Sequence, residues 1–475
     1  MLDITLIREK PDWVKDQLRK LNDEAAVARI DKILELDQRR RALLTEVEQL
    51  KALRNNLSKA TGQLRGNKKL EVGVKHATAQ AVIAALEADD YQKAQGFFEN
   101  PPQHGNSATE AEFQETMNTL FARLGGLGDK ITALDEQVRG VEEAFYEEQL
   151  WVPNMPHASV PVADSDEANI AHPVQGEIRK FDFKAQPHWE LGPALGIIDF
   201  ERGVKIAGTR FYILAGMGAR LQRALINFLL DELTTLWNFE ELYVPLMVKR
   251  EAMYGSGQFP KFVDTSYPLA DLDMYMLPTA EVAIANMLSG EILDEASLPR
   301  NYVGHTPCFR QEKMSAGRDV RGIKRVHQFE KVEMFKLASQ DTSYDEMEKM
   351  MQIAESMIAK LEIPYRRLEI VTGDLGFTAT KKFDIEMWAP GCEEWLEVSS
   401  ISNTEDFQAR RANIKYRPSD GGKAKFVHML NGSCLGIPRT VIAIMENYQT
   451  ADGAIVIPNV LRPYLGGQEI IEPKG

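Results

Sequence analysis

Two charged segments on either side of a basic loop carry the side chains best suited to chemistry. The first, residues 308–312, ends in Arg310 and Glu312. The second, residues 327–334, contains His327, the aromatic residue Phe329, and the charged residues Lys331 and Glu333. Because side chains two positions apart in a strand share a face, each segment should place these groups on one surface of a sheet. Together they could hold a carboxylate, stack a base and orient an amine.

The segment between them is predicted to be a loop that contacts phosphate. Residues 313–325 add Arg318, Arg321, Lys324 and Arg325, with Asp319 as the opposing acid. A packed structural hairpin would seldom carry so many charges on one face. The three segments therefore favour a strand–loop–strand hairpin that binds a nucleotide.

A short triplet, Thr279-Ala280-Glu281, begins a predicted amphipathic helix. Threonine is a favoured N-cap, and the helix dipole favours a glutamate in the first turn. Taken alone, the triplet is therefore typical of an ordinary helix start.

A second short motif is predicted to end a strand. It follows the hairpin signal Ala389-Pro390-Gly391 and consists of Glu397, Val398, Ser399 and Ser400. Strand alternation would put Glu397 and Ser399 on one face and Ser400 on the other. Taken alone, this motif is a solvated strand edge.

The third motif, residues 431–440, runs into a predicted helix at 441–448. Pro438 presets the first helical turn, and Arg439 lies where the helix dipole is positive. An anion such as a terminal phosphate would offset the two positive features. A surface arginine is the plain alternative.

The hairpin resembles the second signature motif of the seryl-tRNA synthetases, which are class II aminoacyl-tRNA synthetases. The resemblance lies in Phe309-Arg310-x-Glu312, Gly317-Arg318-Asp319 and residues 327–333. Other family-like motifs follow the same order along the chain: Pro245, 257–262, 279–281, 397–400, 406–411 and 431–440. The chain departs from the family pattern at Lys313-Met314, Cys434 and Pro438.

The resemblance implies a role for each of these residues. Glu281 would pair with the ammonium group of serine, and Glu333 would take its hydroxyl. The full implied serine site is Thr279, Ala280, Glu281, Arg310, Glu333 and Ser433. The implied ATP site is Arg310, Gln311, Glu312, Phe329, Glu397, Val398, Ser399, Ser400 and Arg439. Arg310 and Arg439 would be catalytic, and Glu397 and Ser400 would hold Mg²⁺ through hard oxygen ligands.

Apolar heptads predict a helical N-terminal third. Leucines recur every seven residues from Leu36 to Leu64, and a second a/d pattern runs from Leu120 to Phe145. Two such stripes in one chain most simply pair as an antiparallel hairpin. The segment between them, residues 65–119, is an insertion in which 76–95 is predicted to form a helix.

The remainder predicts an α+β fold, with an antiparallel sheet flanked by helices in the class II manner. The predicted domains are a tRNA-binding domain at 1–150, a linker at 151–170 and a catalytic domain at 171–475. The absence of Gly-x-Gly-x-x-Gly and of a P-loop motif argues against a Rossmann or P-loop fold.

Composition narrows the class of protein further. The chain has no apolar run long enough to span a membrane and no signal-peptide pattern at its start. Three scattered cysteines favour a reducing, cytoplasmic location, and none has metal-ligand spacing with a histidine. The net charge of −14 argues mildly against nucleic acid, but residues 39–69 form a local basic patch.

The resemblance implies a homodimeric serine–tRNA ligase that acts on L-serine, ATP and tRNA(Ser), and also on tRNA(Sec). Neither a membrane nor DNA is an expected partner. Two alternatives remain open: a class II paralogue that charges a carrier protein, and a non-catalytic RNA-binding or coiled-coil protein. The helical arm argues against the first, and the joint presence of Arg310, Glu312, Glu397 and Arg439 argues against the second.

Overall fold

The computed structural model describes residues 1–313 and 321–473, and it divides into two compact units. One unit comprises residues 1–30 with 150–475, and the other comprises residues 31–149. The first residues belong to the larger unit because the Met1 ammonium group donates to the Phe407 carbonyl at 2.5 Å. Arg410 also pairs with Asp3 at 2.9 Å. The predicted boundaries at 150 and 170 stay a prediction.

The smaller unit is built on two long helices, α3 (Glu24–Gly66) and α6 (Glu110–Leu150). Their leucine stripes are buried in one shared core. Lys51 pairs with Asp135 at 2.9 Å, and Arg40 lies 3.6 Å from Glu142. Residues further along α3 therefore pair with residues nearer the start of α6, which confirms the predicted antiparallel hairpin.

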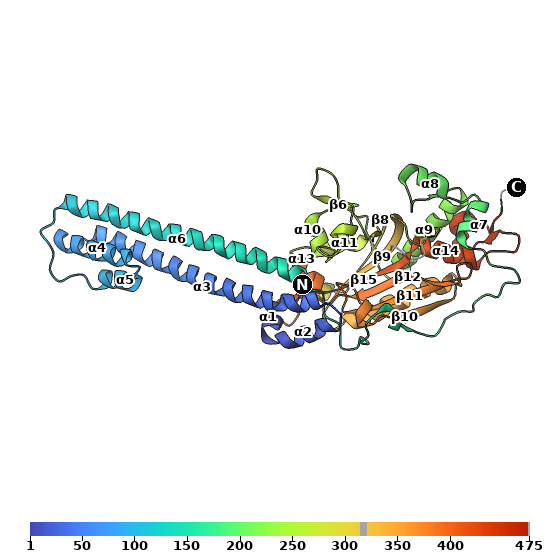
Figure 1. Ribbon diagram of the computed structural model, residues 1–475, viewed down its shortest axis with the longest axis horizontal. Helices are drawn as coiled ribbons and strands as arrows, with labels where there is room; N and C mark the ends of the chain where they lie inside the picture. Colours follow the sequence, from blue (N-terminus) through green and yellow to red (C-terminus); the bar gives the residue numbers. More distant parts are fainter. Residues whose placement is uncertain (314–320, 474–475) are drawn as a thin grey trace. The chain divides into compact units, whose positions relative to one another are not determined.

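The insertion forms two helices rather than one. They are α4 (Val72–Glu87) and α5 (Tyr91–Glu99), so the single helix predicted over 76–95 is wrong. The break occurs because Asp89 adopts φ 53° and the Asp90 side chain caps α5 by accepting from the Lys93 amide. Both helices pack at the end where α3 runs out and α6 begins (Figure 1).

The larger unit contains an eight-stranded, mostly antiparallel sheet in the order β1-β10-β11-β12-β15-β9-β8-β4. Its strands are β1 (Ile170–Ala171), β4 (Glu240–Glu241), β8 (Arg300–Phe309), β9 (Gln328–Ala338), β10 (Tyr365–Glu369), β11 (Lys381–Ala389), β12 (Glu394–Asn403) and β15 (His428–Gly436). The predicted hairpin around Pro390 is the β11–β12 pair, and the predicted hairpin of the two charged segments is β8–β9.

Alternation along β9 separates the two faces of this sheet. Val332 and Met334 belong to an apolar core shared with three helices: α9 (Met217–Leu236), α12 (Ser343–Lys360) and α14 (Ile437–Asn447). Phe335 and Leu337 belong to a second core, shared with α10 (Arg250–Gly255), α11 (Ala280–Asn286) and α13 (Phe407–Ala412). Lys331 and Glu333, which share the parity of Phe335 and Leu337, therefore lie on the face of the second core.

Smaller elements complete the unit. Its remaining α-helices are α1 (Ile4–Glu9), α2 (Pro11–Arg19), α7 (His188–Ala194) and α8 (Phe200–Ala207). Its smaller sheets are formed by β2 (Ile198–Asp199), β3 (Ile213–Leu214), β5 (Met247–Lys249), β6 (Met274–Met276), β7 (Ile292–Asp294), β13 (Lys415–Arg417), β14 (Lys425–Phe426), β16 (Ile455–Val456) and β17 (Ile470–Ile471). Short 3₁₀ turns occur at Asp166–Ala168, Val263–Thr265, Glu295–Ser297, Thr372–Asp374, Asn459–Leu461 and Pro463–Leu465. No helix in the described ranges has the length and apolarity needed to cross a membrane.

Candidate active site

A polar cavity of about 320 Å³ opens on the charged face of the sheet, a size at the lower end of the range for small-molecule sites. It is bounded by β9, β12 and β15 and by the first turns of α11 and α14. Its lining is Glu281, Arg310, Glu312, Ile323, Lys324, Arg325, Val326, Phe329, Lys331, Glu333, Glu397, Val398, Ser399, Ser400, Asn431, Ser433, Gly436, Pro438 and Arg439.

Arg310 and Phe329 form one corner of the cavity. The Arg310 guanidinium lies 5.2 Å from the centroid of the Phe329 ring, and its Nε donates to the Pro278 carbonyl at 3.2 Å. The Arg310 backbone is fixed against His327, whose carbonyl accepts from the Arg310 amide at 3.0 Å. A planar cation beside an aromatic ring can hold an anionic group next to a stacked base.

The predicted placement of Arg310 and Glu312 on the strand is wrong. Strand β8 ends at Phe309, and Glu312 has φ 48°, which breaks the alternation. Glu312 still reaches the cavity, where its carboxylate lies 3.4 Å from Arg325. Its carbonyl accepts from Arg210 at 3.0 Å.

A second corner holds a buried ion pair. The Lys331 ammonium contacts the Glu333 carboxylate and donates to the Thr279 hydroxyl at 2.8 Å. Lys331 is 8 % exposed and Glu333 is 1 % exposed. Ser433 donates weakly to Glu333 at 3.4 Å. A carboxylate held in this way can accept a hydrogen bond from a small hydroxyl group.

Glu281 lies close to this pair but has a different electrostatic environment. Burial raises the pKa of Glu281 to about 7, and the neighbouring Glu333 carboxylate adds to the rise. Gln408 donates to Glu281 at 2.6 Å and Asn431 donates at 3.3 Å. A buried carboxylate of this kind gains most from a cationic partner.

The motif at 397–400 is positioned by a β-bulge. The register between β11 and β12 shifts between Ile385 and Glu386, so that Ser399 and Glu397 face consecutive residues. The predicted split of Glu397 and Ser400 onto opposite faces is therefore wrong, and both line the cavity. Bulges of this kind commonly re-aim side chains beside functional sites.

Asp384 on β11 lies opposite Ser400, and its carboxylate joins this oxygen-rich region. Its pKa is raised to about 7, by burial first and then by Glu397. Its Oδ1 atom is buried with no hydrogen-bond partner among the described residues. For Glu397, burial favours a higher pKa, but Arg439 and other cations outweigh it and hold the pKa below its usual value. Two carboxylates and a hydroxyl are hard donors that fit a divalent cation.

Arg439 lies in the first turn of α14, as predicted. Its Nη1 atom donates to the Glu397 carbonyl at 2.9 Å, and its Nε donates to the Lys324 carbonyl at 3.3 Å. The guanidinium therefore faces the cavity from the positive end of a helix dipole.

Three predicted site residues do not line the cavity. Gln311 turns away, because its side chain donates to the Ser266 carbonyl at 2.6 Å. Ala280 is buried in the second core. Thr279 lies behind Lys331 and caps α11, as the plain interpretation expected. The predicted loop residues Arg318 and Asp319, with Met314 and Gly317, lie outside the described residues.

Several residues at or beside the cavity were missed from the sequence. Asp384 lies beside it, opposite Ser400 in the β11–β12 register, and Gln408 of α13 lies beside it through its bond to Glu281, which local patterns do not reveal. Ile323 and Val326 line it from the end of the basic loop. The sequence predicts Lys324 and Arg325 only as members of a basic loop.

Comparison with known proteins assigns the chain to a family. Residues 268–448 match the family described as tRNA synthetase class II core domain (G, H, P, S and T), and residues 1–94 match the seryl-tRNA synthetase N-terminal domain. A serine--tRNA ligase of Thermomicrobium roseum is 51% identical over 99% of this chain and 95% of its own length. The chain belongs to the seryl-tRNA synthetase family.

Solved structures of the family agree with this fold. The seryl-tRNA synthetase from Pyrococcus horikoshii complexed with ATP is 35% identical and matches with a TM-score of 0.80, covering 100% of both chains. The cytoplasmic serine-tRNA ligase from Naegleria fowleri in complex with AMP is 29% identical, with a TM-score of 0.77 over 100% of this chain and 99% of its own. The predicted class II α+β fold with a helical arm is confirmed.

Proposed function

We propose that this chain is a serine–tRNA ligase that forms seryl-adenylate from L-serine and ATP and transfers the seryl group to the 3′ end of tRNA(Ser). The observation that carries the proposal is one cavity in which groups suited to an amino acid adjoin groups suited to a nucleoside triphosphate. The relatives named above as serine--tRNA ligase and as complexed with ATP support the same substrates. Charging of tRNA(Sec) with serine is a further expectation from the family.

The serine end of the cavity would be formed by Glu281 and Glu333. Glu281 would bind the ammonium group, and Glu333, with Ser433 beside it, would accept the hydroxyl. Thr279 and Ala280 would support this end from behind, since Thr279 accepts from Lys331. Alanine would leave Glu333 buried without its hydroxyl partner, which disfavours it strongly.

The ATP end would be formed by the Arg310–Phe329 corner and by Arg439. Phe329 would stack on the adenine ring, with Glu312 beside the base. Arg310 would bridge the serine carboxylate and the α-phosphate with its planar fork. Val398 and Ser399 would contact the nucleotide from β12, and Arg439 would neutralise the terminal phosphate.

The reaction would proceed in two substitutions. A serine carboxylate oxygen bonds to the α-phosphorus of ATP as the bond to the β-phosphate oxygen breaks, and pyrophosphate leaves with the electron pair. A terminal hydroxyl of tRNA then bonds to the seryl carbonyl carbon, releasing AMP and the hydroxyl proton. The protein would contribute mainly orientation and charge neutralisation, and no side chain is assigned as a base.

Mg²⁺ is the cation proposed for the oxygen-rich region. Glu397 and Ser400 would hold it, and the unpartnered Oδ1 of Asp384 offers a third donor. The bound ion would offset negative charge on the ATP phosphates.

The helical arm would bind tRNA, and the location would be the cytoplasm. The arm carries the basic patch of residues 39–69, which suits backbone contacts to double-stranded RNA. The cysteines Cys308, Cys392 and Cys434 are all free, in keeping with a reducing compartment.

The competing proposals make different demands on this cavity and this arm. A paralogue that charges a carrier protein needs the cavity but no tRNA-binding arm. A non-catalytic RNA-binding protein needs the arm, but it would have no use for the buried pair of Lys331 and Glu333 beside Glu281. The serine–tRNA ligase is the candidate that uses both.

We expect Arg310→Ala to lower serine-dependent ATP–pyrophosphate exchange by about a thousand-fold or more, because it removes charge-assisted hydrogen bonds. The assay should be run with all twenty amino acids, and serine should be the preferred substrate. Arg202→Ala, at a side chain 76% exposed, is the matched control and should keep its rate. Near-normal exchange in Arg310→Ala, or preference for another amino acid, would contradict the proposed serine–tRNA ligase activity.

Serine binding should depend on pH through Glu281. Because the pKa of Glu281 is raised to about 7, the carboxyl loses its charge as pH falls below that value and no longer pairs with an ammonium group. The KM for serine in the exchange assay should rise about ten-fold from pH 8 to pH 6. Glu281→Gln should have a high KM at every pH, and a flat wild-type profile would contradict the role.

Replacing the smaller unit, residues 31–149, by a short glycine-serine linker should separate the two half-reactions. We expect pyrophosphate exchange within about three-fold of the full chain, and charging of tRNA(Ser) reduced by at least about a hundred-fold. Full charging activity without the arm would refute its role in tRNA binding.

We also propose a homodimer built around Pro245 and the edge strand β4. Large apolar side chains are exposed near this edge: Leu236, Trp237, Tyr243 and Met247. Tyr243 alone is 99% exposed, and an exposed apolar patch of this kind marks an interaction surface.

Light scattering should give twice the 53.5 kDa mass of the chain. A Tyr243→Asp and Met247→Asp double variant should dissociate at least about ten-fold more readily, since it buries charge in the interface. Ile206→Asp, at an exposed apolar residue on α8, is the control and should remain dimeric. A monomeric wild-type chain would exclude the proposal.

A further inference from the structure

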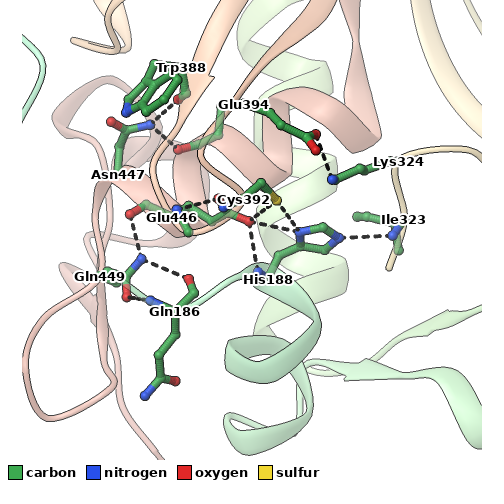
Figure 2. Close-up of polar contacts among 12 residues, drawn as sticks. Gln186, His188, Ile323, Lys324, Trp388, Cys392, Glu394, Glu446, Asn447 and Gln449 are labelled. Atoms are coloured by element: carbon green, nitrogen blue, oxygen red, sulfur yellow. Dashed lines mark hydrogen bonds and ion pairs between the residues drawn. The ribbon is translucent and has the colours of Figure 1, made fainter. Parts of the chain in front are cut away.

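A buried hydrogen-bonded cluster lies behind the cavity and has no role in the chemistry described so far. Its centre is the Glu446 carboxylate, near the end of α14, with His188 of α7 and Cys392 of the β11–β12 turn (Figure 2). The side chains of His188 and Glu446 are 0% exposed.

The Glu446 carboxylate accepts from five donors. Oε1 accepts from the His188 amide and from His188 Nδ1, both at 2.9 Å, and from the Cys392 thiol at 3.0 Å. Oε2 accepts from the amides of Gly391 and Cys392 at 2.9 Å. Burial favours a higher pKa for Glu446, but the hydrogen bonds from His188 and Cys392 outweigh it and lower the pKa. The carboxylate is thus a fixed, ionised anchor.

The other nitrogen of the His188 ring points toward the cavity segment. Nε2 accepts from the Ile323 amide at 3.1 Å, as Figure 2 shows. Gly322 packs so closely that a Cβ atom there would lie 1.9 Å from Nε2, and its φ is +67°. The ring therefore fixes the position of residues 322–323, directly before the cavity-lining Lys324.

This segment in turn holds Arg439. The Lys324 carbonyl accepts from Arg439 Nε at 3.3 Å. Arg439 and Glu446 are seven residues apart on α14, about two turns, so they share one face of the helix. The helix is thus tied to residues 322–324 at both ends: through Arg439 near its start and through Glu446 and His188 near its end.

A metal site is the competing explanation, because ligand atoms of His188, Cys392 and Glu446 lie within 4.8 Å of one another. The hydrogen-bond directions argue against it. Since Nε2 accepts a backbone N–H, the proton of the neutral ring is on Nδ1 and points at Glu446. A metal on Nδ1 would require the ring to lose both protons or to give up Ile323. The set is therefore better explained as a hydrogen-bonded relay.

We propose that His188 is a positioning residue for ATP binding: it links the anchored Glu446 to the backbone at Ile323 and so sets the position of Lys324 and Arg439. The inference deepens the proposed function, on which it rests. Residues at the serine end, Glu281 and Glu333, are not part of this relay, so its loss should affect the two substrates unequally.

Two substitutions at His188 separate its two hydrogen bonds. Asparagine can replace Nδ1 as a donor to Glu446, but it is too short to accept from Ile323. Glutamine can place its amide oxygen near the position of Nε2 and keep that acceptor. We expect His188→Asn to raise the KM for ATP in pyrophosphate exchange about ten-fold, with the KM for serine within about two-fold of wild type. His188→Gln should recover most of the ATP effect, and calorimetric ATP binding should follow the same order.

Thermal unfolding of each variant tests whether the chain still folds. Should His188→Asn fail to fold, Gly322→Ala provides an independent test, because its methyl group would force residues 322–323 and the His188 ring apart without removing either ring nitrogen. It should also weaken ATP binding selectively. Any of three results would overturn the proposal. The first is an equal KM for ATP in His188→Asn and His188→Gln, and the second is a parallel rise in the KM for ATP and the KM for serine. The third is unchanged ATP binding in Gly322→Ala.

Metal analysis of the wild-type chain after exhaustive dialysis is expected to give no stoichiometric zinc, and one zinc per chain would also overturn the relay. If the wild-type chain itself shows no serine-dependent exchange, the proposed function fails. If it exchanges normally and only the variants lack the predicted effect, the positioning role fails alone.

Discussion

The need to bury one face of the central sheet and to balance charge on the other governs the larger unit. Alternation on β9 sends Val332 and Met334 into the core under α9, α12 and α14, and it sends Lys331 and Glu333 to the opposite face. Charges on a half-buried face are costly unless they are paired. The pairing of Lys331 with Glu333, and of Arg439 with Glu397, satisfies this requirement and at the same time shapes the cavity.

The same constraint explains why the acidic groups of the cavity differ from one another. Glu333 has an ammonium neighbour, whereas Glu281 and Asp384 are buried next to other carboxylates, and the pKa of each is raised to about 7. A cation that binds beside such a group favours its charged form. An ammonium group at one end and a divalent metal at the other are the cations that the proposed reaction brings.

The sequence predicts the elements of this protein better than their junctions. Heptads in α3 and α6 are local, repetitive and one-sided, so the hairpin of the arm could be predicted from them. Strand alternation placed Phe329, Lys331 and Glu333 together for the same reason. Arg310 and Glu312 were misplaced because β8 ends one residue earlier, and Ser400 was misplaced because a bulge depends on the partner strand. His188 and Asp384 could not be found, and Gln408 could be placed only in a family-like motif without a role, since their partners are brought together only by tertiary packing.

The two helices of the insertion have a mechanical consequence for the smaller unit. The buried alanines of α4 and α5 share a core with Leu57, Leu64 and Met117. Where they pack, the arm is a thicker bundle, and bending stiffness rises steeply with thickness. With 43 residues, α3 is about 65 Å long. Thermal bending of the smaller unit should therefore be concentrated where α3 and α6 pack on each other alone. The end where α4 and α5 also pack should move as a rigid body.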